Sequence, residues 1–257
     1  MMQDGRERLR TWLRRCLGQE HLELKDCRPL PGYSDCEIVA CKTEQGTVVL
    51  KRYVPEFVDY ARLGPVGTAR KHALVLQEFP PLGVPTPRFL GFAAEGEEAA
   101  LAMEWIAAEP LTPAHRLEAA RVLARLHSLA LDDLSEELAD LAVRSTPNRG
   151  RIGEAPNEPP LQETTLQHGD YFSVNFAAAR GTVKVLDWDF FALGDPMWDL
   201  AFLLKADFRR EDRERVDMAA VLQAYSDVRP FDAARLDWHV ACFEAYWRRR
   251  EHDEEQT

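Results

Sequence analysis

The sequence predicts an α+β protein with two lobes, a β-rich N-terminal lobe followed by a mostly helical C-terminal lobe. Short β-rich runs dominate the first third of the chain, whereas amphipathic helical patterns dominate the remainder. A length of 257 residues is long for one domain and ordinary for two lobes around a cleft, and 46% apolar residues can fill a sizeable core. We place the lobes at residues 1–106 and 107–257, with a hinge near 105–110.

The N-terminal lobe is predicted to begin with a helix and to continue as a sheet. Asp4 can cap a helix in which Leu9, Trp12 and Leu13 recur at helical spacing. A second helix is expected over residues 68–79, because the proline pair that follows cannot continue it. Runs of β-forming residues predict strands over 36–42, 47–53, the end of 83–92, and 99–106.

The C-terminal lobe is predicted to consist mainly of helices. Residues 110–130 have a strong amphipathic pattern that opens at Thr112 and Pro113, residue types that favour the start of a helix. The Pro-, Gly- and Asn-rich segment 145–160 predicts a long loop. Further helices are expected at 132–142, 196–206, 212–226 and 232–249, two short strands at 172–178 and 182–187, and a frayed charged tail at 248–257.

The bulk composition excludes several classes of protein. A net charge of −11 argues against binding to nucleic acid or to an anionic membrane, because both need basic residues to offset phosphates. No stretch approaches the roughly 20 apolar residues of a membrane span, and no secretory signal is recognisable. The cysteines show no metal-binding spacing, so we expect structural thiols in a cytoplasmic protein: Cys16, Cys27, Cys36, Cys41 and Cys242.

The negative charge is unevenly distributed along the chain. Residues 1–107 hold 14 basic and 15 acidic side chains, whereas residues 108–257 hold 18 and 28. The excess in the second half fits either a solvated acidic surface or a field that attracts a cationic ligand. The sequence leaves both interpretations open.

The segment 166–204 carries the most specific pattern in the chain. His168 and Asp170 are followed by Asn175, and a predicted pair of strands then ends at Asp187. This order of H-x-D-x4-N, strand, turn, strand and Asp matches the catalytic loop and the metal-binding loop of protein kinases. The run GDPMWDLA follows directly. Chance agreement of all these parts is improbable, so the segment predicts phosphoryl transfer.

Each residue type in this pattern suits one task. The acceptor hydroxyl must be oriented and relieved of its proton, and a carboxylate on a rigid loop, here Asp170, can do both. Asn175 and Asp187 supply hard oxygen ligands of the kind that Mg²⁺ prefers. His168 is expected to support the loop backbone, because the kinase pattern assigns it no proton transfer. Asp189 is either a second metal contact or a turn residue.

With these motifs the sequence resembles the aminoglycoside phosphotransferase and choline kinase family, small-molecule relatives of protein kinases. HGDYFSVN is similar to the family's catalytic loop, and VLDWDFFALGDPMWDLA to its metal loop and the helix that follows. The resemblance implies a protein-kinase-like fold, Mg²⁺ as the cofactor, and ATP as the phosphoryl donor, with GTP as the open alternative. It also implies a structural role for Asp199, which would tie this helix to the active-site loops.

The resemblance extends to the nucleotide-binding lobe. Residues 30–53 are similar to the family's hairpin over the nucleotide phosphates, and Lys51 would be the strand lysine that contacts the α- and β-phosphates. Residues 103–106 resemble the hinge between the lobes, whose backbone at Glu104 and Ile106 would hydrogen-bond the adenine. The turn of the hairpin would be formed by Gly32, Tyr33 and Ser34.

One departure from the family concerns the partner of Lys51. The resemblance implies a glutamate on the following helix, and the corresponding position holds His72. Glu78, the only acidic residue of that predicted helix, lies almost two turns further on. Either the helix register differs and Glu78 pairs with Lys51, or Lys51 is anchored otherwise, or the enzyme is impaired.

The sequence therefore predicts an ATP-dependent phosphotransferase that acts on a hydroxyl of a small molecule, aminoglycoside-like or choline-like. The acidic C-terminal lobe favours a cationic acceptor, and Trp198 could face its amine or pack in the core. The alternative hypothesis is an impaired nucleotide-binding pseudokinase or interaction module, motivated by His72. A protein kinase proper is disfavoured, because no A-P-E motif follows Asp187.

Overall fold

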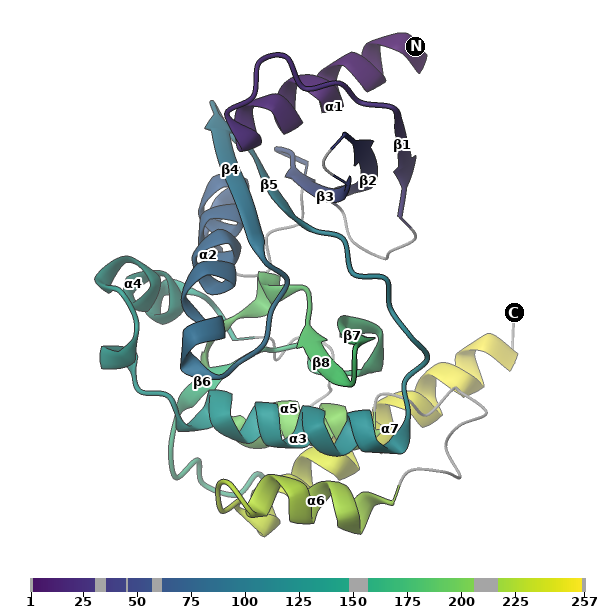
Figure 1. Ribbon diagram of the computed structural model, residues 1–257. Helices are drawn as coiled ribbons and strands as arrows, with labels where there is room; N and C mark the ends of the chain where they lie inside the picture. Colours follow the sequence, from purple (N-terminus) through teal and green to yellow (C-terminus); the bar gives the residue numbers. More distant parts are fainter. Residues whose placement is uncertain are drawn as a thin grey trace.

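The computed structural model describes residues 2–30, 36–44, 46–56, 62–147, 157–205 and 217–255. The N-terminal part contains an antiparallel sheet with the strand order β1-β2-β3-β5-β4, and helices make up most of the C-terminal part (Figure 1). The strands of this sheet are β1 (Asp26–Pro29), β2 (Glu37–Thr43), β3 (Gly46–Tyr53), β4 (Phe89–Glu95) and β5 (Glu98–Glu104).

Two helices cover opposite faces of the sheet, α1 (Met2–Leu17) and α2 (Gly64–Glu78). Trp12 and Leu13 of α1 pack against one face, which includes Leu50 of β3. Because side chains alternate along a strand, the neighbouring Lys51 and Tyr53 lie on the other face, toward α2. The alternation therefore directs the predicted nucleotide lysine into the interior between the sheet and the C-terminal part.

The C-terminal part surrounds two short strand pairs with helices. α3 (Pro113–Ser128) packs against α6 (Met218–Ser226), and α5 (Pro196–Lys205) packs against α7 (Ala233–Glu255). α4 (Glu136–Arg144) lies beside α2, and the β7–β8 hairpin lies above α3 on the side of the N-terminal sheet (Figure 1). The strand pairs are β6 (Thr165–Gln167) with β9 (Ala192–Gly194), and β7 (Phe176–Ala179) with β8 (Thr182–Val185).

Most predicted elements are confirmed, and the α+β class with them. The strands β1, β6 and β9 are not predicted, because segments of three or four residues show no alternating pattern and these three, unlike β7 and β8, do not form a hairpin with a tight turn. The strand predicted from residue 172 begins at Phe176, after a 3₁₀ turn at Ser173–Asn175. The charged tail was predicted to fray, but the backbone of α7 stays helical to Glu255. No helix within the described ranges is long and apolar enough to cross a membrane.

The expectation of thiols throughout is wrong for two of the five cysteines. Cys27 of β1 and Cys41 of β2 form a disulfide across neighbouring strands, with their Cα atoms 4.2 Å apart. The prediction is wrong because β1 has only four residues and no clear strand pattern. The sequence alone therefore does not show that Cys27 lies opposite Cys41. The remaining cysteines are buried outside this bond: Cys16, Cys36 and Cys242.

We expect reduction of the Cys27–Cys41 bond to destabilise the protein. The bond joins residues 14 positions apart, and closing a loop of about 15 residues contributes about 3 kcal/mol through the unfolded state. Thermal unfolding with and without a thiol reductant measures this effect as a drop of several degrees in the midpoint. The Cys27→Ser variant should unfold at the lower midpoint in both buffers. If the unfolding midpoint of the wild type is the same with and without the reductant, the prediction is contradicted.

Candidate active site

The predicted catalytic loop is held at its start by Asp199 of α5. The buried carboxylate of Asp199 accepts hydrogen bonds from the backbone N–H of His168, at 2.6 Å, and of Gly169, at 2.8 Å. Gly169 has a φ of +86°, and a Cβ there would lie 2.7 Å from the Cβ of Phe190. Only glycine fits this conformation and this contact. The loop is therefore fixed to the helix behind it.

Trp198 strengthens the same attachment from the core. Its indole N–H donates to the carbonyl oxygen of Gly169 at 3.1 Å, and its ring packs against Phe202 and Phe243. The side chain is only 4% exposed. Of the two roles that the sequence left open for Trp198, core packing is the one it has.

His168 links the catalytic loop to the segment that carries Asp187. Its Nε2 donates to the carbonyl oxygen of Leu186 at 2.8 Å, and its Nδ1 accepts from the backbone N–H of Asp170 at 3.2 Å. These two partners assign the proton to Nε2. Burial lowers the pKa of His168, which keeps the ring neutral in this arrangement. The contacts are those of a support for the loop.

Asp170 and Asn175 lie against each other within the loop. The amide Nδ2 of Asn175 donates to the backbone carbonyl oxygen of Asp170 at 2.8 Å and to its Oδ2 at 3.0 Å. With Nδ2 used in this way, the amide Oδ1 of Asn175 is left as a donor atom for a cation. The backbone N–H of Leu186 donates to the carbonyl oxygen of Asn175 at 2.8 Å, which brings the Asp187 segment alongside.

The segment with Asp187 and Asp189 receives the strand lysine. Asp187 has a φ of +59°, a left-handed conformation that Asp tolerates better than most residues. The Nζ atom of Lys51 lies 2.7 Å from Oδ1 of Asp187 and 2.6 Å from Oδ2 of Asp189. Burial alone would lower the pKa of Lys51, but the two carboxylates raise it above its ordinary value. Lys51 is therefore a charged side chain in the interior.

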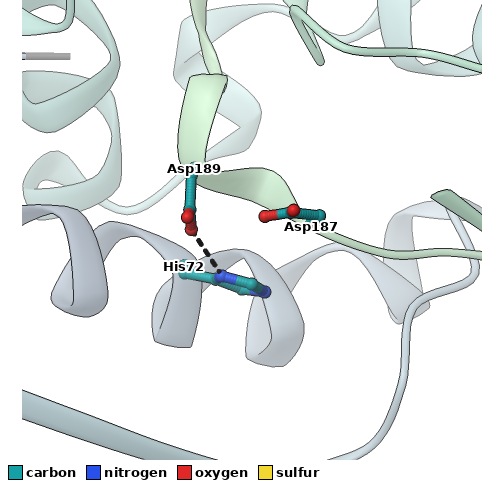
Figure 2. A group of neighbouring side chains, drawn as sticks. All are labelled: His72, Asp187 and Asp189. Carbon is teal, nitrogen blue, oxygen red and sulfur yellow. Dashed lines mark hydrogen bonds and ion pairs between the residues drawn. The ribbon is translucent and has the colours of Figure 1, made fainter. Parts of the chain in front are cut away.

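Asp189 is enclosed by side chains from the sheet and from α2. Its Oδ1 accepts from the hydroxyl of Tyr53 at 2.6 Å and lies 3.1 Å from Nδ1 of His72 (Figure 2). Burial raises the pKa of Asp189, but the charge of Lys51 and the contact with His72 outweigh this and lower it. Burial also lowers the pKa of His72, and its Nε2 has no hydrogen-bond partner within the described ranges.

These contacts settle which side chain meets Lys51. The carboxylate of Glu78 accepts from the backbone N–H of Ser135 at 2.9 Å and from its hydroxyl at 2.7 Å, at the start of α4. Glu78 therefore joins α2 to α4, and the hypothesis that it pairs with Lys51 is wrong. Lys51 is anchored by Asp187 and Asp189 instead.

The buried Lys71 is also part of this region, although no sequence pattern indicates it. Its Nζ donates to the carbonyl oxygens of Asp189 and Phe191, at 2.9 and 2.6 Å, and to the hydroxyl of Ser145 at 3.0 Å. A lysine in an amphipathic helix is ordinarily solvated, so no sequence signal could have identified this contact. Lys71 and His72 are adjacent on α2, and both hold Asp189.

One part of the predicted nucleotide site, the turn of Gly32, Tyr33 and Ser34, lies outside the described residues. Glu104 ends β5, where its backbone N–H donates to the carbonyl oxygen of Arg88 at 3.0 Å. Its carboxylate forms an ion pair with Lys184 of β8. Ile106 follows in the connection to α3. The hinge and the lobe boundary after it stay predictions.

The oxygen donors of this region fit a hard divalent cation. The side chain of Asp187 is 33% exposed and its segment is joined to Asn175. His72, Asp187 and Asp189 also place three potential ligand atoms within 4.8 Å of one another. However, Oδ1 of Asp189 already accepts from the hydroxyl of Tyr53, and Nδ1 of His72 lies within hydrogen-bond distance of both of these atoms. Asp187 and Asn175 therefore stay the predicted pair of ligands for Mg²⁺.

Comparisons with solved structures show the same fold in several small-molecule kinases. The choline kinase LicA from Streptococcus pneumoniae matches with a TM-score of 0.62 and 16% identity over 97% of this chain and 92% of that chain. An aminoglycoside-3'-phosphotransferase of type VIII matches with a TM-score of 0.60 and 18% identity, over 95% and 98%. Amicoumacin kinase hAmiN matches with a TM-score of 0.62 and 12% identity, over 89% and 79%. These likenesses confirm the predicted protein-kinase-like fold.

Sequence comparisons identify the family. A search of curated proteins found no significant match. The model of the phosphotransferase enzyme family, however, matches residues 26–239, which include β1, both active-site loops and most of the helices. The chain therefore belongs to the phosphotransferase enzyme family.

Proposed function

We propose that the protein is an ATP-dependent phosphotransferase that moves the γ-phosphate to a hydroxyl group of a small molecule. The observation that carries this proposal is the meeting of Lys51 with Asp187 on a segment hydrogen-bonded to the loop of Asp170 and Asn175. A phosphate-binding cation, two hard oxygen donors and a candidate base are the parts that phosphoryl transfer needs. Family membership supports the reaction class.

Each side chain has a distinct role in this proposal. Lys51 would hold phosphate oxygens of the nucleotide, and Asp187 and Asn175 would hold Mg²⁺. When bound, Mg²⁺ supplies charge that neutralises the transferring phosphate. Asp170 would orient the acceptor hydroxyl and take its proton, while Nδ2 of Asn175 keeps the carboxylate of Asp170 in place.

ATP is the proposed donor, bound by the turn at residues 32–34 and by the backbone at Glu104 and Ile106. Since the N–H of Glu104 is bonded to Arg88, we assign its carbonyl oxygen to the adenine amino group. The structures of two neighbours are complexes with adenine nucleotides, LicA with AMP and amicoumacin kinase with AMP-PNP and Ca²⁺. The adenine nucleotides of these neighbours support ATP over GTP.

We propose a cationic acceptor. The structural neighbours are named for acceptors as different as choline, aminoglycosides and amicoumacin, so the fold alone selects none of them. The acidic excess over residues 108–257 favours a positively charged molecule. Phe172, two residues beyond Asp170, is half-buried and packs against Phe202 with the ring centroids 5.7 Å apart and the rings tilted by 45°. It offers an aromatic surface for an amine beside the catalytic loop.

A phosphorylation screen tests the proposal. The protein is incubated with Mg·ATP or Mg·GTP and with choline, ethanolamine or aminoglycosides. Two quantities are measured: the amount of nucleotide consumed, and the change in the mass of the acceptor. We expect one acceptor to gain one phosphate in a Mg²⁺-dependent reaction. Nucleotide binding without turnover on any cationic alcohol would favour the pseudokinase hypothesis instead. A cytoplasmic location stays a prediction.

A further inference from the structure

We propose that Asp189 is the acid that positions Lys51 for the nucleotide, and that His72 and Tyr53 hold Asp189 for this task. This inference rests on the proposed function. In kinases, a lysine on this strand is held for the phosphates by an ion pair with a carboxylate of the neighbouring helix. Here that carboxylate comes from the loop of the metal ligand, and the helix supplies the imidazole of His72 that holds it.

The hydrogen bonds of Asp189 give it this role rather than that of a second metal ligand. Its Oδ2 meets Lys51 at 2.6 Å, and its Oδ1 meets Tyr53 at 2.6 Å and His72 at 3.1 Å. Both oxygens are therefore in use before any cation arrives. The side chain of Asp189 is 10% exposed against 33% for Asp187, so Asp187 faces the more open side.

These contacts imply different roles for the carboxylates of Asp187 and Asp189. Lys51 bridges Asp187 and Asp189, and the bridge is one cation against two anions. If Asp187 serves Mg²⁺, Lys51 keeps Asp189 as its anionic partner and stays charged in the interior. Without Asp189, Lys51 would be a buried cation with no carboxylate of its own, which is costly.

The identity of residue 72 is coupled to that of residue 189. Nδ1 of His72 lies 3.1 Å from Oδ1 of Asp189, and a glutamate at position 72 would bring a second carboxylate to this oxygen. Two carboxylates at such a distance repel each other and one takes up a proton. Histidine avoids this repulsion, and with its proton on Nδ1 it donates a hydrogen bond to the carboxylate instead. Lys71, the next residue on α2, holds the carbonyl oxygen of the same Asp189.

The coupling between positions 72 and 189 can be tested by removing the carboxylate at position 189 and placing one at position 72 of α2. The variants are Asp189→Asn, His72→Glu and the double variant, with Asp187→Asn as the matched control. We expect Asp189→Asn to weaken Mg·ATP binding about tenfold or more, because a charge-assisted contact of Lys51 is lost. His72→Glu should weaken binding in the wild-type background and strengthen it in the Asp189→Asn background. It should not restore Asp187→Asn, whose carboxylate we assign to Mg²⁺.

The decisive result is that His72→Glu has opposite effects in the wild-type and Asp189→Asn backgrounds. Thermal unfolding without nucleotide tests this reversal independently of binding. His72→Glu should lower the unfolding midpoint of the wild type and raise that of Asp189→Asn. A purely structural role of His72 predicts a loss in both backgrounds, in binding and in midpoint alike, and that result would overturn the inference. If the wild type binds ATP but phosphorylates no acceptor, the proposed function fails while the binding and unfolding series still judges Asp189.

Discussion

Asp170→Asn should bind Mg·ATP as tightly as the wild type while its kcat falls by about 10³-fold, the usual contribution of a general base. Asparagine keeps the size of the side chain and the backbone carbonyl that Asn175 contacts. It cannot accept the proton of an attacking hydroxyl. The loss should therefore appear in kcat and leave nucleotide affinity unchanged, as for a group that acts mainly in the transition state.

The measurement is steady-state turnover with the best acceptor, beside nucleotide binding by thermal shift. Asp132→Asn is the control, because Asp132 is an exposed acid in a 3₁₀ turn of the C-terminal part and the same substitution there should leave both values unchanged. Turnover by Asp170→Asn within a few-fold of wild type would remove Asp170 from the proposed mechanism. A parallel loss of nucleotide affinity would point to a collapsed loop instead.

The catalytic and metal loops could be predicted from the sequence because their residues are close together in the chain. Asp170, Asn175 and Asp187 fall within 18 residues, joined by a hairpin whose strands are local. Gly169 belongs to the same motif, and its close contact with Phe190 explains why no larger residue stands there. Local motifs of this kind carry their own geometry, so a spacing pattern is enough to recognise them.

The partners of Lys51 could not be predicted in this way. Lys51 and Asp189 are 138 residues apart and come together only when β3, α2 and the metal loop pack against one another. The sequence identified the unusual His72 but not its use, because a buried histidine has no pattern of its own. Lys71 is the sharpest example, since its charge favours a solvated position and tertiary contacts override that preference.

Asp199→Ala should lower the free energy of unfolding by about 2–6 kcal/mol, about 1–3 for each buried donor left without an acceptor. Asp199 has no solvent exposure, and its two oxygens accept the backbone N–H groups of His168 and Gly169. Nε2 of His127 also lies beside this carboxylate, 3.5 Å from Oδ2 of Asp199. Removal of the carboxylate therefore releases the start of the catalytic loop from α5, and turnover should fall together with stability.

Urea unfolding of Asp199→Ala beside Asp217→Ala separates this role from ordinary helix capping. Asp217 is an exposed N-cap whose carboxylate accepts from the backbone N–H of Ala220 at 3.1 Å, and its loss should cost about 1 kcal/mol. Turnover of Asp217→Ala should stay at the wild-type value. Equal losses of stability in the two variants would mean that Asp199 acts only as a helix-terminal acid. A much larger loss for Asp199→Ala, with turnover abolished, follows if its carboxylate holds the loop on which Asp170 is presented.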